Sequence, residues 1–251
     1  MKQIYDYVIF HRNCLDGFTG FFILTTTRKI DDNAIIYPDV PSANTPPPNI
    51  DGKNVIIIDV AYKKEVLVEF FDRCKTVTFI DHHISIRDDV LELIKTKKSK
   101  NVIIVYDEKS SGASLTWKFF NHKKSVPLFI KYIEDNDIGA WKLKHTIPFI
   151  NALHVKYELN LSSKNIQHWH TLFNKNVIKK LIKVGLVYEQ YKEYLIDINL
   201  KRYSLHAFPS ETIYNEYPEI FKKAGQYKVA LYNGSGCPNG SILGLKFMES
   251  I

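Results

Sequence analysis

The chain has 251 residues, 45% of them hydrophobic and 24% charged, which is typical of a folded globular protein and excludes a fully disordered one. Its three cysteines form no C-x-x-C pair, so a disulfide framework is not expected, and no apolar run approaches the ~20 residues that span a bilayer. The net charge of +7, from 34 basic and 27 acidic residues, favours an anionic partner without identifying one.

The first half of the chain alternates short β-rich runs with runs of helical period. Five runs rich in Val, Ile or Tyr predict strands buried on both faces, at Tyr5–Phe10, Ala34–Tyr37, Asn54–Ile58, Thr76–Ile80 and Asn101–Tyr106. Helices are predicted between them, at Gly17–Arg28, Lys63–Cys74 and Ile86–Lys95. This alternation predicts an α/β fold in which a parallel β-sheet is flanked by helices.

The second half is mainly helical. Helices are predicted at Ala113–Phe120, Pro127–Glu134, Ile147–Val155, Ser162–Phe173 and Val177–Arg202. A strand at Tyr227–Tyr232 leads into a glycine-rich loop, Gly234–Gly240, and the start of a helix at Ser241–Met248. We therefore expect an α/β domain over residues 1–160, a helical linker over 161–203 and a small, incomplete C-terminal α/β unit over 204–251.

Polar side chains follow several of the predicted strands at the point where the apolar run stops. The strongest such group is Asp81-His82-His83, and it is matched by His11 to Asp16 after the first strand, by Asp59, and by Asp135 to Asp137 after a helical run. Any one of these groups alone is more often a helix cap or a solvated turn. Because ligands bind beyond the carboxyl ends of parallel strands, their recurrence predicts a functional site there.

The chemistry of these side chains indicates a divalent metal. Carboxylate oxygen with imidazole nitrogen suits Mn²⁺, Mg²⁺, Zn²⁺ or Fe²⁺, and the oxygen-rich mixture favours Mn²⁺ or Mg²⁺. Two ions about 3.5–4 Å apart, bridged by a shared carboxylate, would suit a phosphoryl displacement. No P-loop motif competes for the role of binding phosphate.

These residues, in their order and spacing, resemble the four motifs of the DHH phosphoesterase superfamily. The matching motifs are His11…Asp16-Gly17, Asp59, Asp81-His82-His83 and Asp137, and the resemblance covers roughly residues 5 to 245. That superfamily includes RecJ-type exonucleases, oligoribonucleases, cyclic-dinucleotide phosphodiesterases, exopolyphosphatases and family II pyrophosphatases. The segments around Asp16, Ser111-Gly112-Ala113 and Glu134 look like one sub-branch of it.

The resemblance implies a role for each matching residue. The metal ligands would be His11, Asp16, Asp59, His82 and Asp137, with Asp59 bridging two ions. His83 would face the scissile phosphate and so bind the substrate, and Asp81 would orient an adjacent imidazole. The catalytic residues would then be His83, Asp81 and Asp59, and the cofactor two Mn²⁺ (or Mg²⁺) ions.

The sequence departs from the superfamily pattern in two places. Cys14 stands where a ligand carboxylate is usual; its thiolate would favour a softer metal, and the alternative is a small buried residue in a tight turn. The Gly-Gly-Gly-His signature of the DHH-associated domain is absent before Ile251. Asp135 is the alternative to Asp137 as the ligand of the fourth motif.

We therefore expect a metal-dependent phosphoesterase that hydrolyses phosphodiesters of short single-stranded nucleic acid or nucleotides with a metal-activated hydroxide. The alternatives are a pyrophosphate or polyphosphate hydrolase and a catalytically degenerate nucleotide-binding protein. Trp141 is a candidate for base stacking. Because the N-terminus has no signal-peptide pattern, we expect a cytoplasmic protein, or a nuclear one in a eukaryotic host, with an anionic partner of this kind and no membrane.

Overall fold

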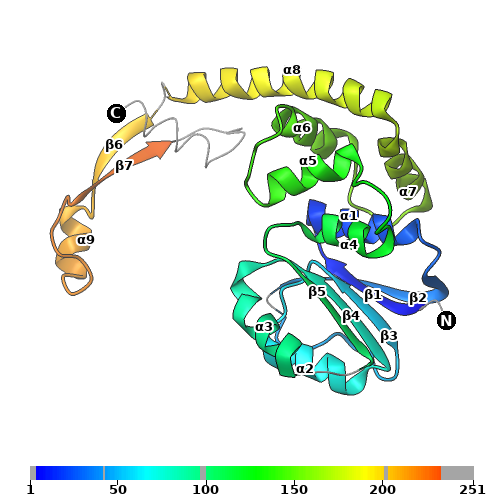
Figure 1. Cartoon of the computed structure of the whole chain (residues 1–251). Coiled ribbons are helices and arrows are strands. Elements are labelled where there is room, and N and C mark those ends of the chain that lie inside the picture. Colours follow the sequence, from blue (N-terminus) through cyan, green and yellow to red (C-terminus); the bar gives the residue numbers. More distant parts are fainter. Residues whose placement is uncertain (1–3, 42, 97–99, 201–202, 233–251) are drawn as a thin grey trace. The chain divides into compact units, whose positions relative to one another are not determined.

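The computed structural model describes residues 4–41, 43–96, 100–200 and 203–232 (Figure 1). The chain divides into two compact units, Met1–Gly185 and Leu186–Ile251. Each unit is described by itself below. The three-part division expected from the sequence stays a prediction.

The first unit is built on a five-stranded parallel sheet. Its strands are β1 (Tyr5–His11), β2 (Ile30–Asp39), β3 (Asn54–Ile58), β4 (Thr76–Asp81) and β5 (Val102–Tyr106), in the order β2-β1-β3-β4-β5. The predicted α/β fold class is therefore confirmed. The second strand, predicted over four residues, extends over ten.

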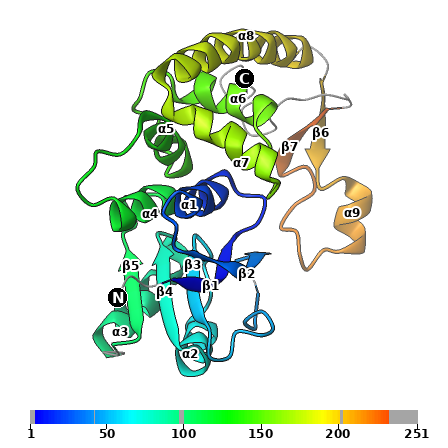
Figure 2. The ribbon, with the colours of Figure 1, turned by 90° about the vertical axis from the view of Figure 1, so that its right-hand side faces the viewer.

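Helices cover both faces of this sheet (Figures 1 and 2). One face is covered by α1 (Leu15–Thr25) and α4 (Gly112–Phe120). The other face is covered by α2 (Lys64–Arg73) and α3 (Arg87–Thr96). A short 3₁₀ turn, η1 (Ile84–Ile86), precedes α3. Each face has its own apolar core. In the sheet, β2 and β3 lie on opposite sides of β1. The chain runs from β1 outwards to β2 and then crosses back to β3, so the direction in which successive strands are added reverses between β1 and β3.

A second helical layer packs on α1 and α4 (Figure 2). It contains α5 (Leu128–Asp137), α6 (Thr146–Lys156), α7 (Ser163–His170) with the 3₁₀ turn η2 (Thr171–Phe173), and the start of α8 (Lys175–Leu200). Trp169 of α7 is fully buried against Phe18 and Phe22 of α1. At Gly185 a Cβ atom would lie only 1.7 Å from the Pro148 carbonyl oxygen, so glycine lets α8 approach the α6 backbone.

The described part of the second unit consists of the end of α8 and an antiparallel pair, β6 (Tyr203–Phe208) with β7 (Tyr227–Tyr232), joined through α9 (Glu211–Glu216). The strand β7 was predicted, whereas β6 and α9 were not. The predicted glycine-rich loop Gly234–Gly240 and helix Ser241–Met248 lie outside the described residues. Within the described ranges, no helix has both the length and the apolar character required to cross a membrane.

Candidate metal centre

The polar residues that follow the strands meet at the carboxyl edge of the sheet. His11 is the last residue of β1, Asp59 follows β3, and Asp81 ends β4. The three strands are adjacent in the sheet, and the change of direction lies between β1 and β3. In open parallel sheets this position is where ligands bind.

Asp59 lies at the centre of the group. Its backbone adopts the left-handed conformation, with φ of +62°, and its amide donates to the Ile80 carbonyl at 2.9 Å. The left-handed region is unfavourable for most residues other than glycine, and strained backbone of this kind clusters at functional sites. The residue is 1% exposed, so this turn holds a carboxylate in a buried position.

Both carboxylate oxygens of Asp59 have polar neighbours. Oδ1 lies 3.1 Å from His82 Nε2, whereas Oδ2 accepts from Cys14 Sγ at 3.3 Å. His11 Nδ1 lies 3.4 Å from the same Oδ2, at ion-pair distance but without hydrogen-bond geometry. One carboxylate therefore joins residues from β1, from the start of α1 and from the loop after β4.

Two further carboxylates approach the same imidazole. His82 Nε2 lies 3.2 Å from Asp137 Oδ2 and 3.8 Å from Asp16 Oδ2. Asp16 comes from the first turn of α1, and Asp137 is the last residue of α5. The Nε2 atom of His82 thus faces three carboxylates that belong to different elements.

Asp81 organises the turn that carries the two histidines. Its Oδ1 accepts from the backbone amides of His82, at 2.6 Å, and His83, at 2.7 Å. The same oxygen lies 2.9 Å from His83 Nδ1. If Nδ1 donates this bond, Nε2 of His83 is left free for a ligand. Asp81 is fully buried, and its contact with His83 Nδ1 is compatible with the orienting role that the resemblance implies.

Glycine is required at two points around the cluster. A Cβ atom on Gly17 would lie 2.7 Å from His11 Cβ, and one on Gly112 would lie 2.8 Å from Asp59 Cβ and 2.9 Å from Asp16 Oδ2. Next to Gly112, Ser111 caps α4 by accepting from the Ser114 amide, and the Ala113 amide donates to Asp16 Oδ1 at 3.1 Å. The amino end of α4 therefore packs directly on the carboxylates.

The carboxyl groups of the cluster differ in their pKa values. Burial opposes ionisation of Asp59, but His11, His82 and His83 outweigh it and lower its pKa to about 2. Burial and the nearby Asp59 raise the pKa of Asp137 to about 6, and the same two causes raise that of Asp16 well above its ordinary value. In the metal-free protein, Asp16 and Asp137 therefore keep their protons to a higher pH than an ordinary carboxyl group does.

Burial and the nearby aspartates also shift the pKa values of His82, His83 and the Cys14 thiol. Burial opposes a charge on His82, but hydrogen bonding to Asp59 and the charges of Asp16, Asp59 and Asp137 raise its pKa to about 9. Burial also opposes protonation of His83, whereas Asp81 outweighs it and raises that pKa. Burial and the Asp59 charge raise the pKa of the Cys14 thiol, so this thiol is neutral in the metal-free protein.

The donor set fits divalent metal ions. Ligand atoms converge within 4.8 Å in three overlapping groups: His11, Cys14 and Asp59; Asp59, His82 and His83; and Asp16, His82 and Asp137. The buried atoms His11 Nδ1, Asp16 Oδ2 and Asp81 Oδ2 have no hydrogen-bond partner. Among the described residues, the ion pairs of these aspartates are all with histidines. Buried negative charge without lysine or arginine nearby calls for a cation.

The residues predicted from the sequence therefore come together, with one exception. The residues brought together are His11, Asp16, Asp59, Asp81, His82, His83 and Asp137. Asp135, the alternative for the fourth motif, binds the loop after α5 instead: its carboxylate accepts from the amides of Lys142 and Leu143 and from the Thr146 hydroxyl. The packing role of Gly112 was not foreseen, although the Ser111-Gly112-Ala113 segment was noted.

Comparisons with known proteins add one relative. The chain is 26% identical over 216 residues to "Uncharacterized protein R106" of Acanthamoeba polyphaga mimivirus, an alignment that covers 81% of this chain and 48% of the viral protein. The chain thus spans about half the length of that relative. No family model matches the chain, and no solved structure matches it.

Proposed function

We propose that the protein is a metal-dependent phosphoesterase of the DHH kind, acting on phosphodiesters of short single-stranded nucleic acid or nucleotides. The observation that carries this proposal is that Asp59 belongs to two groups of ligand atoms, with Oδ1 next to His82 and Oδ2 next to Cys14 and His11. A carboxylate shared in this way suits two closely spaced ions. The candidate ions are Mn²⁺ or Mg²⁺, and Cys14 beside His11 leaves room for a softer metal there.

Each residue then has a task that its position supports. Asp16, His82 and Asp137 would hold one ion, His11 the other, and Asp59 would bridge them. The ions, when bound, would polarise the phosphoryl group and acidify water. His83, held by Asp81 through Nδ1, would offer Nε2 to a non-bridging phosphoryl oxygen, so that the phosphorus is oriented towards the carboxylate cluster.

The substrate class is part of the proposal. The net charge of +7 would speed the encounter with an anionic substrate, in a cytoplasmic setting. The same charge would serve pyrophosphate or polyphosphate equally well. One observation favours a non-catalytic nucleotide-binding protein: Cys14, a neutral thiol that donates to Asp59, stands where a carboxylate ligand is expected.

The test is hydrolysis of the p-nitrophenyl ester of thymidine 5′-monophosphate by the purified full-length chain. We expect nitrophenol release in Mn²⁺ that is abolished by EDTA and restored by added metal. Asp59→Asn should remove this activity, because it takes away the bridging carboxylate. Asp88→Asn is the matched control, since it removes an exposed carboxylate from α3 and should keep the activity.

Two outcomes would contradict the proposal. Activity that persists in EDTA, or that Asp59→Asn leaves intact, would mean that the cluster is not the reaction centre. No hydrolysis of this ester, of dinucleotides or of pyrophosphate in any divalent metal would favour the non-catalytic alternative.

A further inference from the structure

A cavity lies against α5 and the loop that follows it. This α5 cavity has a volume of about 310 Å³ and is lined by Lys109, Lys131, Lys142, Glu134, Asp135 and the apolar side chains of Val126, Ile138, Ala140 and Leu143. That volume is at the small end of the range for small-molecule sites. Lys131, Glu134, Asp135 and Ile138 follow helical spacing, so they form one face of α5.

The charge in the α5 cavity is available to an anion. Among the described residues, Lys109, Lys131 and Lys142 make no ion pair. The two carboxylates in the wall are already engaged: Asp135 by the loop that follows α5, and Glu134 by the Ser111 amide, which donates to Oε1 at 3.3 Å. Three lysines in the wall of one cavity, none of them in an ion pair among the described residues, favour a phosphate, because an ammonium group donates charge-assisted hydrogen bonds to phosphate oxygens.

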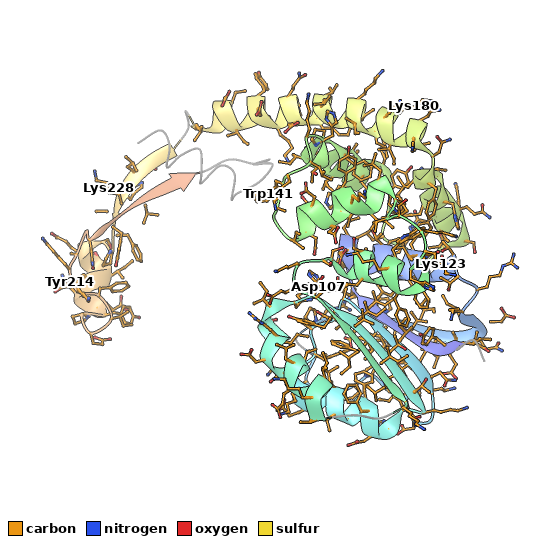
Figure 3. All side chains as sticks on the ribbon, in the orientation of Figure 1. Asp107, Lys123, Trp141, Lys180, Tyr214 and Lys228 are labelled. Carbon is orange, nitrogen blue, oxygen red and sulfur yellow. The ribbon has the colours of Figure 1, made fainter. Side chains whose placement is uncertain are left out.

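The apolar part of the cavity wall restricts the class of ligand further. Val126, Ile138 and Leu143 offer nothing to pyrophosphate or to a free phosphate ion, whereas they suit a sugar or a base. Trp141 lies between two lining residues, Ala140 and Lys142, with its side chain 63% exposed (Figure 3). Its backbone is fixed by the left-handed conformation, with φ of +44°, and by the bond from its amide to the Asp135 carbonyl.

The α5 cavity also adjoins the candidate metal centre. Glu134, in its wall, accepts a hydrogen bond from the Ser111 amide. The next residue, Gly112, lies so close to Asp59 and Asp16 that a Cβ atom there would clash with both. Asp137, a member of the metal centre, directly precedes Ile138 of the cavity wall. A ligand in the cavity would thus lie one loop away from a phosphate at the metal centre.

We propose that the α5 cavity binds a nucleotide, with its phosphate on the ammonium groups of Lys109, Lys131 and Lys142 and its base against the apolar wall and Trp141. The binding itself stands apart from the proposed function. Its use, to hold the nucleotide next to the scissile phosphodiester, rests on the proposed function and would favour oligonucleotides over pyrophosphate as substrates.

Binding is tested without metal, by calorimetric titration of the full-length chain with adenosine 5′-monophosphate in EDTA. The Lys131→Ala/Lys142→Ala double variant should bind at least about tenfold more weakly, because two charged donors are lost. The control is Lys123→Ala/Lys180→Ala, which removes the same charge from exposed positions outside the cavity (Figure 3). Undetectable binding to the unmodified chain at millimolar nucleotide, or equal binding by the two double variants, would overturn the proposal.

Trp141 supplies a second readout. Trp117 and Trp169 are buried, at 7% and 0% exposed, so quenching of the solvent-exposed tryptophan emission by the nucleotide reports on Trp141. Trp141→Ala should weaken nucleotide binding about tenfold, the scale of one base–aromatic stack, and leave the binding of inorganic phosphate unchanged. An equal loss for both ligands would contradict base stacking at this position.

The substrate role is tested by hydrolysis of a dinucleotide. The Lys131→Ala/Lys142→Ala variant should raise KM for the dinucleotide at unchanged kcat, whereas Lys123→Ala/Lys180→Ala should leave both constants unchanged. An unchanged KM together with lost nucleotide binding would overturn the substrate role. If the unmodified chain hydrolyses nothing but binds nucleotide through the lysines, the proposed function fails while the nucleotide site stands.

Discussion

Two aspartates at the end of α5, separated by one residue, have opposite surroundings. Asp135 accepts hydrogen bonds from the amides of Lys142, at 2.8 Å, and Leu143, at 3.1 Å, and from the Thr146 hydroxyl. Burial acts against its ionisation, but these donors outweigh it and lower its pKa. Asp137 instead faces Asp59, and burial together with that charge raises its pKa to about 6.

The difference separates a region that contributes to stability from the candidate metal centre. The Asp135 loop, residues 140–146, satisfies its carboxylate with protein donors and so contributes to stability. The candidate metal centre gathers carboxylates that histidines alone neutralise only in part, which costs stability in the absence of a cation. Buried acids of this second kind are found where a ligand supplies the missing charge.

The largest effect on stability is expected at the first of the two aspartates. Asp135→Ala leaves the amides of Lys142 and Leu143 without their acceptor, so we expect the free energy of unfolding to fall by about 3 kcal/mol. For a protein of this size that corresponds to a loss of about 6–12 °C in Tm. Urea unfolding measures it, with the exposed Asp88→Ala as control. A loss below about 1 kcal/mol would show that the loop does not depend on this carboxylate.

At the second aspartate the expected loss is of activity. Asp137→Asn removes a proposed metal ligand but keeps the shape of the side chain, so Mn²⁺-dependent hydrolysis should fall by about 100-fold. The unfolding midpoint of the metal-free protein should not fall, because the substitution removes a carboxylate that is repelled by Asp59. Activity within a few-fold of the unmodified chain would place Asp137 outside the reaction centre.

The smallest effect is a dependence of stability on pH. Because the pKa of His82 is raised from 6.5 to about 9 in the folded protein, the folded chain binds more protons than the unfolded chain between these values. This contribution is complete below pH 6.5 and is lost as the pH rises through about 9. We expect the metal-free protein to lose on the order of 1–2 kcal/mol across that window.

Thermal unfolding in EDTA at a series of pH values measures this loss. His82→Gln should flatten the slope, because it removes the titrating imidazole. His122→Gln, at an exposed position, should keep it. An equal slope in both variants would assign the titration to another group.

Much of the fold was predictable because the strands end abruptly. In β3 and β4 the apolar run passes directly into Asp59 and Asp81, so both the sheet and its functional edge could be read from the pattern. The strand β6 was missed because Tyr203–Phe208 carries Ser204 and His206 and is therefore not a continuous apolar run. Its pairing with β7 depends on a contact across some twenty residues, which no local pattern reports.

The roles of Asp135 and Asp137 could not be separated from the sequence. Both follow the same helical run, and the donors that engage Asp135 come from residues 142–146, further along the chain. The same is true of Gly112, since its contact with Asp59 joins residues on different elements. The DHH resemblance selected Asp137, and the geometry places that residue beside His82.

The most direct test of the metal centre is anomalous diffraction from crystals of the full-length chain soaked in Mn²⁺. We expect anomalous peaks within about 2.0–2.3 Å of carboxylate oxygens and imidazole nitrogens, with Asp59 contacting both ions if two are bound. Well-ordered Asp59 and His82 side chains without an anomalous peak between them, at millimolar Mn²⁺, would contradict this expectation.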